Sequence, residues 1–167
     1  MTIETSDLIA LPDTAKVWVY QSNRPFTADE NTLIESVLSE FMHSWKSHGD
    51  ALRADFAVLH NCFIVLGVDE NVSGASGCSI DSSVKVIREL GDKLGIDLLD
   101  KSQIAYQTAS DANQIQIIDF RKVKEAVASS MITRDTYIFN NQVTSLGELK
   151  QSWLLKAEQT WMAKYFS

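Results

Sequence analysis

The chain has 167 residues, of which 45% are hydrophobic and 22% are charged, a composition typical of globular proteins. This length is enough for one domain over residues 1–167, with a core that needs no disulfide or metal ion to hold it together. The acidic net charge of −7 argues against a nucleic-acid or anionic-membrane surface, because binding phosphate groups requires clustered lysine and arginine.

The N-terminal segment is acidic rather than basic. Residues 1–11 lack a basic stretch and contain Glu4 and Asp7 instead, so we expect neither a signal peptide nor a transit peptide. No apolar run in the sequence approaches the roughly 20 residues that a membrane-spanning helix needs. Two cysteines without an export signal favour the cytoplasm, where thiols stay reduced. We expect residues 1–14 to form a loose arm.

The first two predicted elements are a strand and an amphipathic helix. β-Branched and aromatic residues predict a strand over residues 16–21. Thr27, followed three residues later by Glu30, is a capping box that predicts the start of a helix. Apolar residues then recur at helical spacing as far as Trp45, and Gly49 is the predicted C-terminal cap of this helix.

Two strands and a second helix follow. Residues 51–60 and the apolar run 62–68 predict a pair of strands joined by a tight turn at Asn61. A helix with one apolar stripe is predicted over residues 80–94, and Gly95 closes it.

The remaining sequence predicts more strands and helices around the same core. Strands are predicted over residues 104–107, 114–118 and 136–139, and helices over residues 120–129 and after Ser145. The first six elements run β-α-β-β-α-β, which is the order of a ferredoxin-like unit. We therefore expect an α+β fold with a mainly antiparallel sheet, a ferredoxin-like N-terminal part, and additional C-terminal strands and helices.

The segment before the second helix has the most distinctive chemistry. Small residues lead into a helix start, where unpaired N–H groups and the helix dipole stabilise an anion or a thiolate. The glycines let a backbone approach a ligand closely, and the hydroxyls are donors for phosphate or carboxylate oxygens. The predicted ligand-binding residues are Gly74, Ser76, Gly77, Ser79, Ser82 and Ser83, with Arg24 as a clamp for a small anionic ligand.

Simple turn chemistry explains the same segment equally well. In that interpretation Ser79 or Asp81 caps the helix, the glycines make the turn, and Cys78 is a small packed residue. The sequence leaves both interpretations open.

A third interpretation is a thiol-dependent enzyme. Cys78 would be the nucleophile, with His48 or His60 as its base. His48 also suits a helix C-terminus, where a protonated imidazole complements the dipole. Nothing in the sequence places either histidine beside the thiol.

Motifs for metals and cofactors are missing from the sequence. His43 and His48 are five residues apart on a predicted helix, which is not the spacing of a metal-binding pair. A Gly-Lys pair does not occur, which excludes a Walker A loop, and Gly-x-Gly-x-x-Gly is also missing. We therefore expect no metal site and no cofactor.

Four segments together resemble a known family. They are residues 17–24 (VWVYQSNR), 45–49 (WKSHG), 75–83 (ASGCSIDSS) and 139–141 (FNN). They are similar to a family of short bacterial proteins often labelled "ABC transporter ATPase", and the resemblance covers nearly the whole chain. This sequence lacks the Walker A lysine and the Leu-Ser-Gly-Gly-Gln signature, so we treat the label as an error. The resemblance implies no activity and no site residue.

Three functional hypotheses follow from the sequence. The first is a cytoplasmic module that binds a small anionic ligand at residues 74–83. The second is a thiol enzyme that uses Cys78. The third is an interaction protein that forms homo-oligomers through its aromatic C-terminal tail, residues 150–167.

Overall fold

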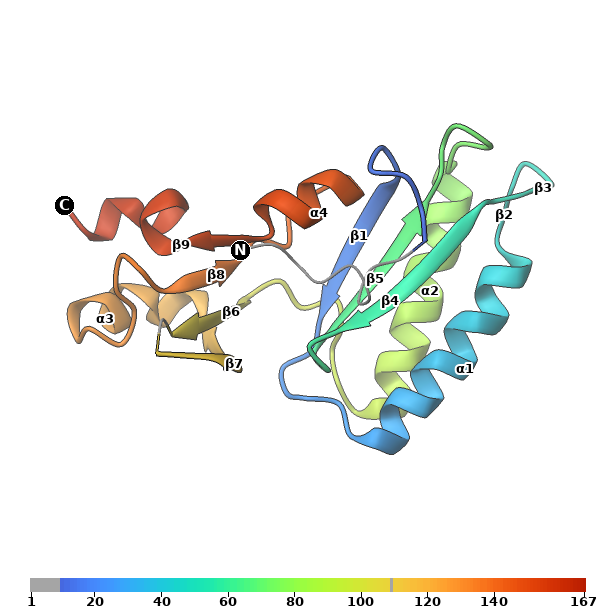
Figure 1. The fold of residues 1–167 in the computed structure, drawn as a ribbon. Helices are drawn as coiled ribbons and strands as arrows, with labels where there is room; N and C mark the ends of the chain where they lie inside the picture. The colour runs from blue at the N-terminus through green and yellow to red at the C-terminus, as the bar shows by residue number, and fades with distance from the viewer. Residues whose placement is uncertain (1–9, 109) are drawn as a thin grey trace.

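The computed structural model describes residues 10–108 and 110–167 and shows an α+β fold built on antiparallel sheets (Figure 1). The predicted fold class is therefore confirmed at this level. Most of the predicted N-terminal arm, residues 1–9, lies outside the described residues. Within the described part of the chain, no helix is both long and apolar enough to span a membrane.

The first sheet has three strands in the order β1 (Lys16–Gln21), β5 (Phe63–Val68) and β4 (Ala54–Leu59), each antiparallel to its neighbour. β5 is buried at every position, as the continuous apolar run predicts for a central strand. His60 and Asn61 form the tight turn between β4 and β5, both with positive φ (54° and 52°). The predicted strand pair is confirmed.

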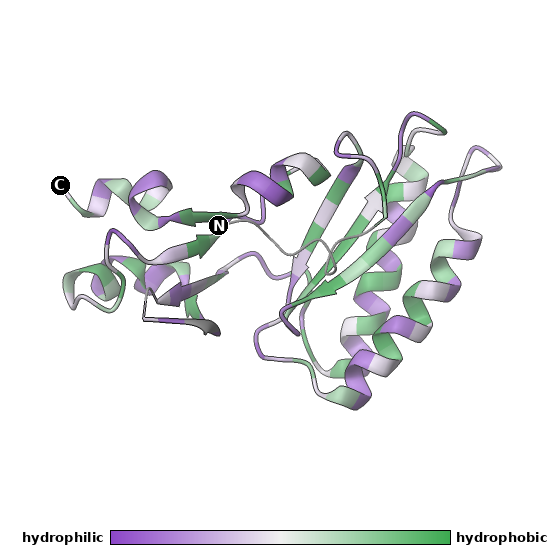
Figure 2. Cartoon of the chain, viewed as in Figure 1, coloured by the Kyte–Doolittle hydropathy of each residue, from purple (hydrophilic) through white to green (hydrophobic). Residues whose placement is uncertain are grey.

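Two helices, α1 (Ala28–Ser44) and α2 (Gly77–Leu94), cover one face of this sheet (Figure 1). The predicted capping box is present: Glu30 N–H donates to the Thr27 hydroxyl at 3.2 Å, and Thr27 N–H donates to the Glu30 carboxylate at 2.9 Å. Gly95 ends α2 in the left-handed region. Figure 2 shows that hydrophobic residues recur along the strands of this sheet and along α1 and α2.

The first helix ends earlier than the sequence indicated. It stops at Ser44, and a small hairpin follows, formed by β2 (Lys46–Ser47) and β3 (Asp50–Ala51). His48 and Gly49 are the tip of this hairpin, so their predicted roles at a helix C-terminus were wrong. The cause is Trp45, which is extended (ψ 122°), buries its ring and donates its indole N–H to the Ser79 carbonyl at 2.8 Å.

The second sheet has four antiparallel strands in the order β7-β6-β8-β9. Their bounds are β6 Gln103–Thr108, β7 Asp111–Asp119, β8 Tyr137–Phe139 and β9 Leu154–Lys156. Two short helices accompany the sheet, α3 (Val123–Ala128) and α4 (Leu146–Ser152), and 3-10 turns at 157–159 and 161–165 complete the chain. β9 was not predicted.

The two sheets share an aromatic core on the face of the first sheet away from α1 and α2. Trp153 is fully buried there, and its ring lies 4.8 Å from Phe63 and 4.9 Å from Phe139, centroid to centroid. The His60 ring packs against the same three side chains. The C-terminal tail therefore contributes Trp153 to the core.

The ferredoxin-like order of the sheet is not completed. β6, the strand that follows α2, joins the second sheet instead of lying beside β1. A short segment pairs briefly with the outer edge of β1: Val17 N–H donates to the Thr144 carbonyl at 3.0 Å, and Leu146 N–H donates to the Ala15 carbonyl at 2.9 Å. This diversion of β6 leaves space beside β1.

Candidate functional site

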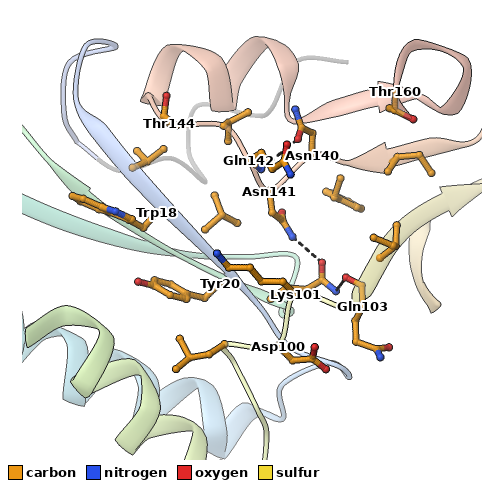
Figure 3. Close-up of a pocket in the computed structure, with 18 of the residues that line it drawn as sticks. Trp18, Tyr20, Asp100, Lys101, Gln103, Asn140, Asn141, Gln142, Thr144 and Thr160 are labelled. Atoms are coloured by element: carbon orange, nitrogen blue, oxygen red, sulfur yellow. Dashed lines mark hydrogen bonds between the residues drawn. The ribbon is translucent and has the colours of Figure 1, made fainter. Parts of the chain in front are cut away.

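A cleft of about 860 Å³ lies beside β1 (Figure 3). Its walls come from β1 itself, from residues 98–104, which lead from α2 into β6, and from residues 138–144 around the end of β8. The 3-10 turn at Trp161 closes part of its rim. This volume falls within the range of about 300–1,000 Å³ that is usual for small-molecule sites.

Side-chain amides form one end of the cleft in a fixed arrangement. Gln21, which is only 7% exposed, donates from Nε2 to the Gln103 carbonyl at 3.2 Å and accepts at Oε1 from Asn141 Nδ2 at 2.8 Å. Trp153 Nε1 donates to Asn141 Oδ1 at 2.9 Å, which fixes which way the Asn141 amide points. A second proton on each amide nitrogen is left for a ligand.

The remaining walls are mainly apolar. Trp18 and Tyr20 line one side, and Val19, Phe139 and Val143 also line the cleft. Burial raises the pKa of Tyr20, and its hydrogen bond to Ser83 acts in the opposite direction. Tyr20 is therefore a neutral side chain at physiological pH, with a large apolar face for a ligand.

Three charged side chains line the cleft in the described residues: Lys16, Asp100 and Lys101. Ser102 donates to the Asp100 carboxylate from its hydroxyl at 2.7 Å and from its N–H at 2.8 Å, and these bonds lower the pKa of Asp100. Lys16 Nζ lies 5.4 Å from the centre of the Trp18 ring.

Lys101 is the charged group best placed to meet a ligand. Its side chain extends into the cleft from the 98–104 wall (Figure 3), and no hydrogen bond or ion pair joins its ammonium to another described residue. The cleft is thus locally positive in a chain whose net charge is −7. Anionic groups are the natural partners of such an ammonium.

The segment that the sequence singled out is the start of α2. Ser76, rather than Ser79 or Asp81, is the N-cap, so Gly77 and Cys78 lie in the first helical turn. The Ser76 hydroxyl accepts from Ser79 N–H at 3.2 Å, and the Ser79 hydroxyl accepts from Ser76 N–H at 2.7 Å.

The other hydroxyls of this segment also bond to the helix itself. Ser82 donates to the Cys78 carbonyl at 3.0 Å, and Ser83 donates to the Ile80 carbonyl at 2.6 Å. A Cβ placed on Gly74 or Gly77 would meet no atom within 4 Å, and neither has a positive φ. The hydroxyls therefore act mainly within the helix start, as the turn interpretation expects. Two details of that interpretation were wrong, because the cap is Ser76 and because Cys78 is exposed rather than packed.

The residues predicted to assist this segment lie at different ends of the molecule. His60 precedes β5 and Cys78 follows it, which separates them by a strand of roughly 20 Å. His48 is at the same end as Cys78, because Trp45 and Ser79 are hydrogen-bonded there. No hydrogen bond in the described residues joins His48 to Cys78.

Arg24 is at the other end of α2 and is already engaged. It donates to both Glu30 carboxylate oxygens, at 2.7 and 2.8 Å, and to the Leu94 carbonyl at 3.2 Å. The hydrogen bonds from Arg24 and from Thr27 hold the pKa of Glu30 at about 2. Arg24 and His60 therefore do not share a site with the 74–83 segment.

The two thiols have contrasting surroundings. Both are free; Cys78 is exposed, whereas burial raises the pKa of Cys62 to about 11. Among the described residues, no group of three or more His, Cys, Asp or Glu side chains could hold a metal ion.

Alkylation should separate these two cysteines clearly. At pH 8 we expect iodoacetamide to modify Cys78 at least about tenfold faster than Cys62, because the thiolate is the reactive form and burial suppresses it. Peptide mass spectrometry over a time course measures both rates in one sample. Equal rates would mean that the β4–β5 end of the sheet opens. Fast modification of Cys78 already at pH 6 would support the thiol-enzyme hypothesis.

The cleft was not predicted from the sequence, because its walls come from distant segments. Two signals were present: Gln21 at the end of a β-branched and aromatic strand, and the pair Asn140-Asn141 after a strand. Both read locally as the ends of strands.

Comparisons of the chain with protein-family models, with curated proteins and with solved structures found no match, so its own residues carry the argument for function.

Proposed function

We propose that this protein is a binding module that holds a small anionic ligand in the cleft beside β1. The observation that carries the proposal is the ammonium of Lys101, which has no hydrogen bond or ion pair among the described residues and lines a cleft of about 860 Å³ together with the two oriented amides of Gln21 and Asn141. Apolar walls with a few fixed polar groups are the usual composition of a ligand site.

The proposal keeps the predicted class of function and changes the place of the site. The hydroxyls of residues 74–83 bond mainly to their own helix start, whereas the cleft offers donors that are not yet used. A thiol enzyme based on Cys78 and self-association through residues 150–167 remain predictions. Trp161 is a large hydrophobic side chain of this tail that is 47% exposed and lines the cleft, so it is accessible to either a ligand or a partner.

We also propose that the first sheet with α1 and α2 is a ferredoxin-like unit without its fourth strand. The order β1-β5-β4 supports this, since the third strand of a ferredoxin-like unit lies between the first two. The cleft then occupies the place of the missing strand.

Binding of simple anions tests the proposal. The probes are phosphate, benzoate, phenylacetate and acetylated amino acids, titrated while backbone and side-chain amide shifts are followed by NMR. We expect one or more carboxylates to bind, and Lys101→Ala to weaken that binding by about 10- to 100-fold, since a hydrogen bond to a charged group contributes about 1.5–3 kcal/mol.

The matched control is Lys85→Ala, which removes an exposed lysine on α2 that does not line the cleft. Its affinity for the same probes should equal that of the wild type. Unchanged affinity in Lys101→Ala, or no binding of any probe to the wild type, would refute the cleft as an anion site.

A further inference from the structure

The outer edge of β1 presents backbone groups to the cleft. Successive residues of a strand direct their N–H and C=O groups to opposite sides. Val17 N–H points away from β5 and donates to the Thr144 carbonyl. The backbone N–H and C=O groups of Val19 and the N–H of Gln21 therefore point to the same outer side of β1. In the described residues, no backbone hydrogen bond takes up Val19 N–H, Val19 C=O or Gln21 N–H.

The segment around Ser145 pairs with this edge at one position and then turns away. Ser145 pairs with Lys16 as an isolated antiparallel bridge. Thr144 would continue the ladder, but its N–H donates at 2.9 Å to the Glu148 carboxylate. Val17 C=O therefore lacks the partner that a continuing strand would supply, and the segment turns away from β1.

The open part of the edge is short and closed at both ends. Thr144 bounds it at Val17, and the bonds of the Gln21 side chain to Gln103 and Asn141 bound it at the other end. From Val17 to Gln21 a strand spans roughly 14 Å at about 3.4 Å per residue. That length fits about three to five residues of extended chain.

An extended peptide matches what this edge offers. Its N–H and C=O groups alternate as those of β1 do, and addition of a strand to an open edge is a known mode of peptide recognition. Side chains of such a peptide would point alternately to the two faces of the first sheet. One face there has Trp18 and Tyr20, and the other has Val19 with Phe139, so apolar side chains fit both.

Charge completes the match. Lys16 and Lys101 line the cleft, and Asp100 is engaged by Ser102. We infer that the ligand is a short apolar peptide with a free carboxylate, which pairs with Val19 and becomes the fourth strand of the first sheet. This inference rests on the proposed function and names the class of its ligand.

Peptides methylated on single backbone nitrogens test the pairing. The probes are acetylated tripeptides of Val, Leu and Phe with free carboxylates, and the same peptides with one N-methyl group at each position in turn. Alternate N–H groups of a paired strand point away from β1. We therefore expect an N-methyl group to weaken binding at least about tenfold where the peptide N–H points toward β1. An N-methyl group on the neighbouring residue, whose N–H points away from β1, should be tolerated.

Hydrogen exchange on the protein gives an independent readout. In the bound state, Val19 and Gln21 amides should exchange at least about tenfold more slowly than in the free protein. Trp18 and Tyr20 amides point toward β5 and serve as internal controls, which should change little. Val19→Pro removes the donor at an edge position, and Val19→Ile keeps it, so only the proline variant should lose peptide binding.

The results for the two sets of probes distinguish the peptide site from the simple anion site. If benzoate or phenylacetate binds in a Lys101-dependent way while no tripeptide binds, the peptide inference is overturned and the anion site stands. Tripeptides that bind equally well with any amide methylated would also overturn it. If neither class of probe binds the wild type, both the inference and the proposed function fail.

Discussion

Replacing Trp153 by alanine is expected to lower the free energy of unfolding by about 3–5 kcal/mol, the usual cost of removing a large buried aromatic side chain. Trp153 is fully buried and packs between Phe63 of the first sheet and Phe139 of the second. Its removal opens a cavity where the two sheets meet, and it takes away the donor that orients Asn141.

Urea denaturation followed by circular dichroism measures this effect. The matched control is Trp161→Ala, which removes the same side chain from a position that is 47% exposed and should change stability by less than about 1 kcal/mol. Trp153→Phe keeps part of the side-chain volume but loses the hydrogen bond to Asn141. It should therefore lower the free energy of unfolding less than Trp153→Ala does, yet still weaken ligand binding. Similar losses for Trp153→Ala and Trp161→Ala would contradict the packing described here.

Gly91→Ala should destabilise the protein by about 2–3 kcal/mol, because there is no room for a methyl group at this point of α2. A Cβ on Gly91 would lie 2.5 Å from the Ile96 carbonyl oxygen. That backbone is held in place, since Ile96 N–H donates to the Gly91 carbonyl at 2.9 Å. The segment after Ile96 must then shift, and it leads directly into the wall of the cleft that carries Lys101.

Gly77→Ala in the same helix is the matched control. A Cβ there meets nothing within 4 Å, and alanine has the better helix propensity, so stability should stay equal or rise by up to about 1 kcal/mol. Thermal unfolding of both variants gives the comparison. A Gly91→Ala protein as stable as the wild type would show that the turn after α2 adjusts freely, which the observed packing does not allow.

Local signals in the sequence were enough for much of the fold. The capping box at Thr27 and Glu30, the turn at Asn61 and the cap at Gly95 all rest on contacts between near neighbours. Such contacts depend on the residue types in one short segment. They predicted the elements of the first sheet and both of its helices.

The features of the fold that were not predicted depend mainly on contacts between residues far apart in the sequence. α1 ends early because the Trp45 indole binds Ser79, 34 residues away. β6 leaves the first sheet because it pairs with β7 and β8. β9 is a strand of only three residues next to a short helix, which is too short for a periodic pattern.

The candidate site was missed for the same reason. The sequence indicated residues 74–83, where small residues and a thiol lie together in one segment. The cleft instead joins Gln21, Lys101 and Asn141, which are far apart in the chain and read locally as a strand end, a loop and a turn. Only the topology brings them together.

Mapping where a ligand binds would locate the site on the protein directly. Amide chemical shifts would be recorded while the tightest-binding carboxylate or tripeptide of the two probe sets is added to the full-length protein. We expect the largest changes at Val19 and at the side-chain amides of Gln21 and Asn141, which line the cleft. Changes confined to residues 74–83 would contradict it and return the site to the start of α2.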